Sequence, residues 1–146
     1  MQRTFERTVP HAPVQMLELV ADVKSYPDFI PNCESMTVTG GHPPVDDRYD
    51  ARMLIRFGPI AQAYTSRIVV DRDALTLSAT SRDAPFRYLD SLWRFEPRGE
   101  GTHIVFSIDF RIANPLIAAV AEPAFAAKQD EIMDAFVREA DRRFPR

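Results

Sequence analysis

The segment DVKSYPDFIPNC, from Asp22 to Cys33, follows a short amphipathic segment and precedes a long run of predicted strands. It holds two prolines, two aromatic residues and the only cysteine of the chain. Pro31 lacks a backbone N–H, so a helix that begins at Tyr26-Pro27 ends after one or two turns. We therefore expect a short, proline-bounded helix that forms a lid at the mouth of an apolar cavity, which the remaining chain builds.

The residues before this segment predict a strand and a short helix. Residues 3–10 alternate between apolar and polar side chains, as a half-exposed strand does. Pro13 suits the first turn of a helix, whose apolar face is predicted to contain Val14, Leu17 and Ala21. The first strand is therefore followed by two short helices, the second of which is the lid.

After the lid segment, apolar residues recur at every second position, which indicates strands. The predicted strands cover residues 35–39, 48–57, 63–70, 75–80, 86–95 and 102–112. Short turns such as Gly58-Pro59 join consecutive strands, and such connections are typical of antiparallel pairs. With the first strand, the pattern predicts an antiparallel meander of six to seven strands.

From Asn114 nearly to Phe144 the apolar period becomes helical. Pro123 removes a backbone hydrogen bond, so it is predicted to kink this run and to separate a short leading piece from a long helix beginning near Glu122. The apolar stripe of the long helix consists of Phe125, Gln129, Ile132, Met133, Phe136 and Ala140. The chain is therefore predicted to be α+β, with residues 1–146 forming one domain in which a curved antiparallel sheet surrounds a long C-terminal helix.

Composition argues against several classes of protein. The net charge of −3 gives no global basic field, so DNA binding is not expected. The longest uncharged apolar run, residues 112–121, is far shorter than the ~20 residues that span a bilayer, and the first residues lack a signal-peptide core. One cysteine and three scattered histidines predict neither a disulfide nor a metal site. We expect a cytoplasmic, bacterial protein with peripheral contact with the inner membrane at most.

The order of elements, the segment SYPDFIPNC and the C-terminal EIMDAFVREADRRF together resemble the coenzyme Q-binding START-like family. This family includes a ribosome association toxin branch and polyketide cyclase-like relatives. The resemblance spans essentially the whole chain, and its most specific part is the pattern Tyr26, Pro27, Phe29, Pro31 and Cys33. Many members carry a tryptophan where this chain has Asn32. The resemblance implies a helix-grip fold whose cavity holds ubiquinone or a similar polyprenyl lipid, which the protein delivers to the respiratory chain without catalysing a reaction.

The candidate ligand-binding residues are the apolar side chains of the lid, the inward residues of the strands and the stripe of the long helix. They are Tyr26, Phe29, Ile30, Tyr49, Met53, Ile55, Tyr64, Ile68, Trp93, Phe106, Phe110, Phe125, Gln129, Ile132, Met133 and Phe136. Aromatic residues on an inner face equally suit a filled core. Gln129 fits a hydrogen bond to a quinone carbonyl, and it fits a polar position at the seam of helix and sheet equally well. The quinone is predicted as a ligand; no catalytic residue or cofactor is predicted.

A second function is implied by the toxin branch, whose members bind the large ribosomal subunit and block subunit joining. Basic residues on the predicted outer sheet face and at the C-terminus would suit RNA phosphates. These residues are Arg52, Arg56, Arg67, Arg142, Arg143 and Arg146. A charged stripe of this kind is also common on an ordinary solvated face, so both interpretations stay open.

A third function is a polyketide cyclase-like enzyme, which would need a titratable group buried in the cavity. The inward faces offer the hydroxyl groups of Tyr49, Tyr64 and Ser66 but no carboxylate or histidine of matching parity. Cys33 has no cationic neighbour in sequence, which favours a small buried hydrophobe over a reactive thiol. Enzymatic activity is therefore less supported than lipid binding.

Overall fold

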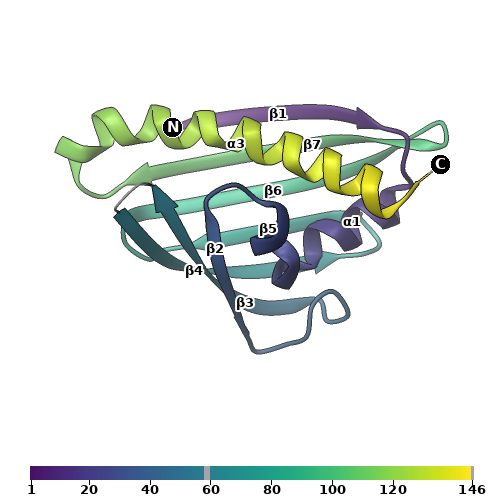
Figure 1. The fold of residues 1–146 in the computed structure, drawn as a ribbon, viewed down its shortest axis with the longest axis horizontal. Coiled ribbons are helices and arrows are strands. Elements are labelled where there is room, and N and C mark those ends of the chain that lie inside the picture. Colours follow the sequence, from purple (N-terminus) through teal and green to yellow (C-terminus); the bar gives the residue numbers. More distant parts are fainter. Residues whose placement is uncertain (58–59, 146) are drawn as a thin grey trace.

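Seven strands form one antiparallel sheet in the computed structural model, which describes residues 1–57 and 60–145 (Figure 1). The strands are β1 (Gln2–Val9), β2 (Cys33–Thr39), β3 (Arg48–Phe57), β4 (Ile60–Asp71), β5 (Thr76–Ser81), β6 (Phe86–Arg98) and β7 (Gly101–Ile112). Their order across the sheet is β1-β7-β6-β5-β4-β3-β2, so β2 to β7 form the predicted meander and β1 pairs with β7. The turn predicted at Gly58-Pro59 lies outside the described residues.

The helices pack on the inner face of this sheet (Figure 1). They are α1 (Pro13–Ala21), the 3₁₀ turn η1 (Val23–Ser25), the one-turn helix α2 (Tyr26–Phe29) and the long helix α3 (Pro115–Arg143). α3 runs along β7 and β1, while α1 lies against β5, β6 and the C-terminal part of α3. The two short helices expected after the first strand are confirmed, and so is the long helix held by a curved sheet.

The prediction that Pro123 divides the terminal helix is wrong, because α3 is continuous from Pro115 to Arg143. The fixed φ of proline is itself helical, so an exposed proline removes one hydrogen bond without forcing the backbone out of the helix. The neighbouring residue also anchors this part of α3 to the sheet. The carboxylate of Glu122 is buried and accepts a hydrogen bond from the backbone N–H of Ile112 at 2.9 Å.

The apolar face of α1 differs from the predicted one. Val14 is 54% exposed, whereas Met16, Leu17, Leu19, Val20 and Ala21 are all buried. Burial on the C-terminal half of α1 is wider than one stripe because that half contacts the sheet and α3 at the same time. Val14, in the first turn, lies outside this contact.

Two irregularities bend the sheet around α3. The register shifts between Cys33 and Ser35 in β2 and between Phe86 and Tyr88 in β6. A bulge of this kind bends its strand and increases the local twist. The alternating apolar residues predicted for β7 are buried on the inner face, which confirms the predicted period.

Candidate functional site

A cavity of about 130 Å³ lies between the inner face of the sheet and α3. Side chains of β2 to β7 form its wall, α3 covers it, and the lid segment, defined as Tyr26–Asn32, forms one side. Among the described lining residues, Asn32 of this segment is exposed. The partly exposed ones include Met36 of β2, Ile55 of β3 and Ile132 of α3, together with Ala79 of β5 and Ser91 of β6. The mouth of the cavity is therefore between the lid segment, the β2–β3 edge and α3.

Most of the candidate residues line this cavity. They are Tyr26, Ile30, Met53, Ile55, Tyr64, Ile68, Trp93, Phe106, Phe125, Gln129, Ile132 and Phe136. Whether they contact a ligand stays a prediction. Sequence reasoning missed small and polar lining residues, including Ala51, Ser66, Ala79 and Ser91, although strand parity placed Ala51, Ser66 and Ala79 inward.

Four candidates do not line the cavity. Tyr49, Phe110 and Met133 are almost fully buried in the packed core. Tyr49 lies under α1, where its hydroxyl group donates to the carbonyl oxygen of Ala21 at 2.6 Å. Phe29 packs against α3 at the lid, with its ring centroid 5.4 Å from that of Phe136. Alternation along a strand predicts that a side chain lies on the inner face. Whether that side chain is part of the packed core or lines the cavity depends on how the helices pack over it.

Aromatic contacts hold the lid segment closed on α3. The rings of Tyr26 and Phe29 both meet Phe136 edge-on, with centroid distances of 5.2 Å and 5.4 Å. Edge-to-face pairs are favourable beyond the area they bury. The lid segment and α3 therefore meet through a small aromatic cluster, which motion of either element would break.

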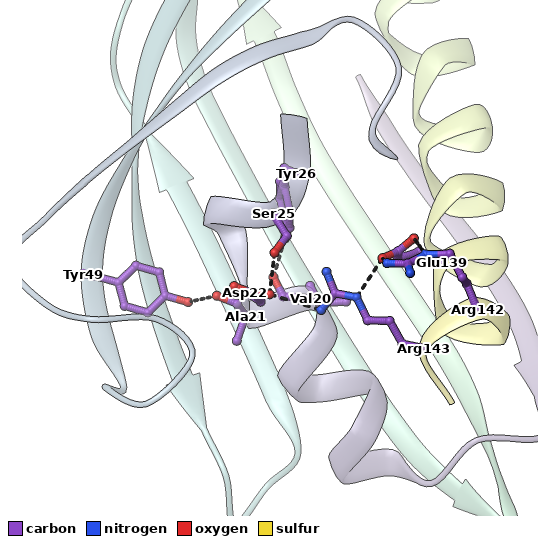
Figure 2. Close-up of polar contacts among 9 residues, drawn as sticks. All are labelled: Val20, Ala21, Asp22, Ser25, Tyr26, Tyr49, Glu139, Arg142 and Arg143. Carbon is purple, nitrogen blue, oxygen red and sulfur yellow. Dashed lines mark hydrogen bonds and ion pairs between the residues drawn. The ribbon is translucent and has the colours of Figure 1, made fainter. Parts of the chain in front are cut away.

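A group of ion pairs ties the base of the lid segment to the C-terminal end of α3 (Figure 2). We call it the polar clasp: Asp22, Ser25, Glu139, Arg142 and Arg143. The Asp22 carboxylate accepts hydrogen bonds from the Ser25 hydroxyl group at 2.6 Å and from Arg143 at 3.1 Å. Arg143 also donates to Glu139 at 2.7 Å. Glu139 is nearly buried, and hydrogen bonds from Arg142, with a further contribution from Arg143, lower its pKa to about 2.

Two tyrosines satisfy the carbonyl groups at the C-terminal end of α1 (Figure 2). The hydroxyl group of Tyr26 donates to the Val20 carbonyl oxygen, and that of Tyr49 donates to Ala21. The last carbonyl groups of a helix have no partner within the helix, so these bonds replace water there. Burial raises the pKa of both phenols, which keeps them protonated as donors. The start of the lid segment is therefore fixed in place.

Asn32 fixes the far end of the lid segment. Its φ of 68° lies in the left-handed region, which asparagine adopts more readily than a bulky aromatic residue does. Its side chain donates to the carbonyl oxygen of Arg56 at 2.8 Å, and the Arg56 N–H donates back to its carbonyl oxygen. Asparagine at this position is thus explained by backbone conformation. The adjacent Cys33 is buried, and burial raises the pKa of its thiol to about 11, as expected for an unreactive side chain.

The polar groups in the cavity are hydrogen-bond donors rather than acids or bases. Tyr64 and Ser66 line it from the inner face of β4, and Gln129 lines it from α3, where one of its amide N–H groups donates to the Phe125 carbonyl oxygen at 3.3 Å. Burial raises the pKa of Tyr64, whose hydroxyl group donates to the weak acceptor Met53 Sδ at 3.8 Å. Among the described lining residues none is a carboxylate or a histidine, and Lys128 at the edge is paired with Glu131 at 3.0 Å. The cavity can orient a polar head by hydrogen bonds, but it offers no evident general base.

The outer face is less basic than the arginines of the sequence suggested. Arg56 pairs with Glu34 at 2.7 Å, and Arg67 pairs with Asp50 at 3.3 Å. Arg142 and Arg143 are both bound to Glu139 in the polar clasp. Arg146 lies outside the part of the chain that the structure describes. Most of the charge predicted for an RNA-binding stripe is therefore neutralised by neighbouring carboxylates.

The histidines lie away from the cavity. His11 is buried and contacts Asp141 at 2.8 Å, while His103 contacts Glu6 at 2.8 Å on the outer face. Within residues 1–57 and 60–145, no three potential metal ligands gather in one place. None of the helices in this part combines the length and hydropathy that crossing a membrane requires.

Comparisons with known proteins agree with the resemblance carried by the Tyr26–Cys33 pattern. A family model described as "Polyketide cyclase / dehydrase and lipid transport" matches residues 9–137. The ribosome association toxin RatA of Rickettsia prowazekii is 25% identical over 142 residues, which are 94% of this chain and 95% of the relative. The mitochondrial coenzyme Q-binding protein coq10 of Schizosaccharomyces pombe is 27% identical over 136 residues, which are 92% of this chain and 83% of the relative.

A solved structure supports the fold independently. The Zhui aromatase/cyclase of a Streptomyces species superimposes with a TM-score of 0.83, over 98% of this chain and 96% of that chain. The two sequences are only 19% identical, so the match concerns the fold alone. The predicted helix-grip, START-like architecture is confirmed.

Proposed function

Because the chain belongs to the polyketide cyclase/dehydrase and lipid transport family, we propose that it binds ubiquinone or a similar polyprenyl lipid and delivers it for respiratory electron transport. The observation that carries this proposal is the character of the cavity. Its wall is apolar, its polar groups are donors, and no carboxylate or histidine is found among its described lining residues. Such a cavity suits binding and release without a chemical step.

The size of the cavity suits the head of a quinone rather than the whole lipid. A cavity of about 150 Å³ holds one benzene molecule, and this cavity measures about 130 Å³. A single quinone ring would fill most of it, with its carbonyl oxygens able to accept hydrogen bonds from Tyr64, Ser66 or Gln129. The tail would then leave through the mouth beside Ile55 and Ile132, or the lid segment would open to admit more of it.

Opening of the lid segment is part of the proposal. Shielding the tail from water is favourable by ~0.8 kcal/mol per CH₂ group, so space made by an open lid is filled at a net gain. Tyr26 and Phe29 meet α3 through the aromatic cluster at Phe136, and the guanidinium of Arg143 also lies over the Phe29 ring at 5.8 Å, while the polar clasp holds the base of the segment. Because the Asn32–Arg56 hydrogen bonds hold the far end of the segment as well, opening would break these contacts with α3 while both ends of the segment stay anchored.

Fluorescence of Trp93 tests this function directly, since it is the only tryptophan of the chain and lines the cavity. Titration with a short-tailed ubiquinone analogue should quench its emission with a saturable curve. Tyr64→Phe should weaken binding roughly fivefold, the equivalent of one hydrogen bond of ~1 kcal/mol. Tyr88→Phe is the matched control, because Tyr88 bonds Asp109 away from the cavity. Absence of saturable quenching, together with purified protein that yields no lipid on organic extraction, would contradict the proposal.

Association with the large ribosomal subunit is the second candidate function. It is supported by relatives named ribosome association toxin, one of them 25% identical over 94% of this chain. Against it, Arg56 and Arg67 are already paired with carboxylates. Co-sedimentation with large subunits, lost in Arg52→Gln and unchanged in the control Arg98→Gln, would support this candidate over lipid delivery.

A further inference from the structure

The first turns of α3 present an apolar surface that the rest of the described chain leaves open. Leu116, Ile117 and Val120 are 87%, 54% and 78% exposed. Figure 1 shows this end of α3 extending past the ends of the strands. We call residues 113–124 the apolar helix end. An exposed patch of this kind on a soluble domain commonly marks a surface that meets a partner or a membrane.

The outer surface of the apolar helix end carries no charged side chain. Between Ile112 and Ala127 the only ionisable residue is Glu122, and its carboxylate turns inward to accept the Ile112 N–H at 2.9 Å. Asn114 caps the helix by accepting the N–H of Leu116 at 2.9 Å. The strongest polar groups of the segment are therefore used internally, and its outer surface is almost entirely hydrocarbon.

Cationic side chains flank the apolar helix end. Arg87 and Arg111 are exposed on adjacent strands, at the ends of β6 and β7 from which α3 leaves. The Ala113 N–H bonds the Pro85 carbonyl oxygen at 2.9 Å, which holds this strand end and the start of α3 together. An apolar projection beside cations is the arrangement that binds anionic lipid surfaces.

We propose that the apolar helix end inserts into the interface of a bilayer containing anionic lipids. Its dimensions favour a bilayer over a second protein copy. Its ten helical residues, 115–124, form a cylinder about 15 Å long, whose whole side surface is roughly 500 Å². A stable dimer buries about 800 Å² per partner, which this projection does not provide. A fluid bilayer, in contrast, closes around a convex projection of any outline.

Insertion at this point brings the cavity to the membrane. Phe125 lines the cavity and follows Val120 by five residues, about 7.5 Å along the helix axis. Its ring also packs against Phe86 and Phe110 at 5.2 Å and 4.8 Å, which couples the apolar helix end to the strands beneath. This role in lipid exchange rests on the proposed function, whereas docking itself is measured separately.

Vesicle flotation with matched variants tests the inference. Val120→Ser and the control Val45→Ser remove the same side chain at nearly equal exposure, 78% and 77%, with Val45 in the loop between β2 and β3. On vesicles of phosphatidylcholine with 30% phosphatidylglycerol, Val120→Ser should lower the partition coefficient several-fold, and Leu116→Ser/Val120→Ser should lower it by about tenfold or more. Val45→Ser should stay within about twofold of the unsubstituted protein. Arg87→Gln/Arg111→Gln should remove the preference for anionic vesicles over pure phosphatidylcholine.

Equal flotation of the two valine variants would overturn the inference. It would also be overturned if sedimentation velocity gave a dimer for the unsubstituted protein and a monomer for Leu116→Ser/Val120→Ser. Quinone binding, followed through Trp93 in the absence of vesicles, should be the same in all of these variants. For the unsubstituted protein, quenching by the quinone without vesicle binding would refute docking alone, and vesicle binding without quenching would refute the lipid-carrier function alone.

Discussion

Filling the cavity should stabilise the protein and weaken ligand binding. Ala79, on the inner face of β5, lines the cavity, so Ala79→Leu places three more carbon atoms inside it. At ~24 cal/mol per Å³, an empty volume of 130 Å³ costs the unliganded fold about 3 kcal/mol. A leucine that fills part of it should raise the free energy of unfolding by about 1 kcal/mol, or Tm by about 3 °C.

Urea unfolding and Trp93 quenching by a short-tailed ubiquinone analogue measure the two effects on one protein. Quinone affinity should fall at least about tenfold, since the ring and the leucine compete for the same volume. Thr80→Leu is the control, because the next residue of β5 points to the exposed outer face, and both quantities should change little there. If Ala79→Leu were less stable than Thr80→Leu, the added leucine would have no empty space to fill, and the cavity beside Ala79 would not be a void. If quenching survived unchanged, the quinone site would lie elsewhere.

Three further predictions concern the elements around the cavity. Glu139→Gln should destabilise the fold by about 1–2 kcal/mol at pH 7, because the pKa of Glu139 is lowered to about 2 in the folded protein. This contribution is fully present above the unfolded pKa near 4.3 and is lost as pH falls towards 2. Urea denaturation should therefore show a smaller difference in free energy of unfolding between the unsubstituted protein and Glu139→Gln at pH 3 than at pH 7. A difference that stays constant would contradict the assignment. Phe29→Ser/Ile30→Ser should speed quinone release in stopped-flow experiments, and unchanged retention and vesicle transfer in a folded variant would refute the lid. Gly101→Ala should lower Tm by more than Gly99→Ala, since an added Cβ meets the Val9 carbonyl oxygen only at Gly101; equal losses would refute this.

The periods of the sequence determined the type and order of the elements. The alternation in β3 and β7 and the helical period after Asn114 depend on local sequence alone, so they could be predicted without knowledge of packing. Proline effects were less predictable. Pro31 does stop a short helix, whereas Pro123 does not break α3, where the buried Glu122 bonds the end of β7. The difference lies in a contact with another element, which no local rule contains.

Parity determined which side chains face inward, and the tertiary structure decided which of them face a void. Tyr49 and Met53 share one face of β3, yet Tyr49 is buried under α1 while Met53 lines the cavity. The position of α1 over one end of the sheet makes this difference, and it depends on contacts between residues far apart in the chain. The polar clasp is decided in the same way, because Asp22 and Arg143 become neighbours only when α3 runs back along β7 and β1 to the C-terminal end of α1. The sequence therefore determined a lid segment, a sheet and a long helix, and long-range packing alone decided where they leave space between them.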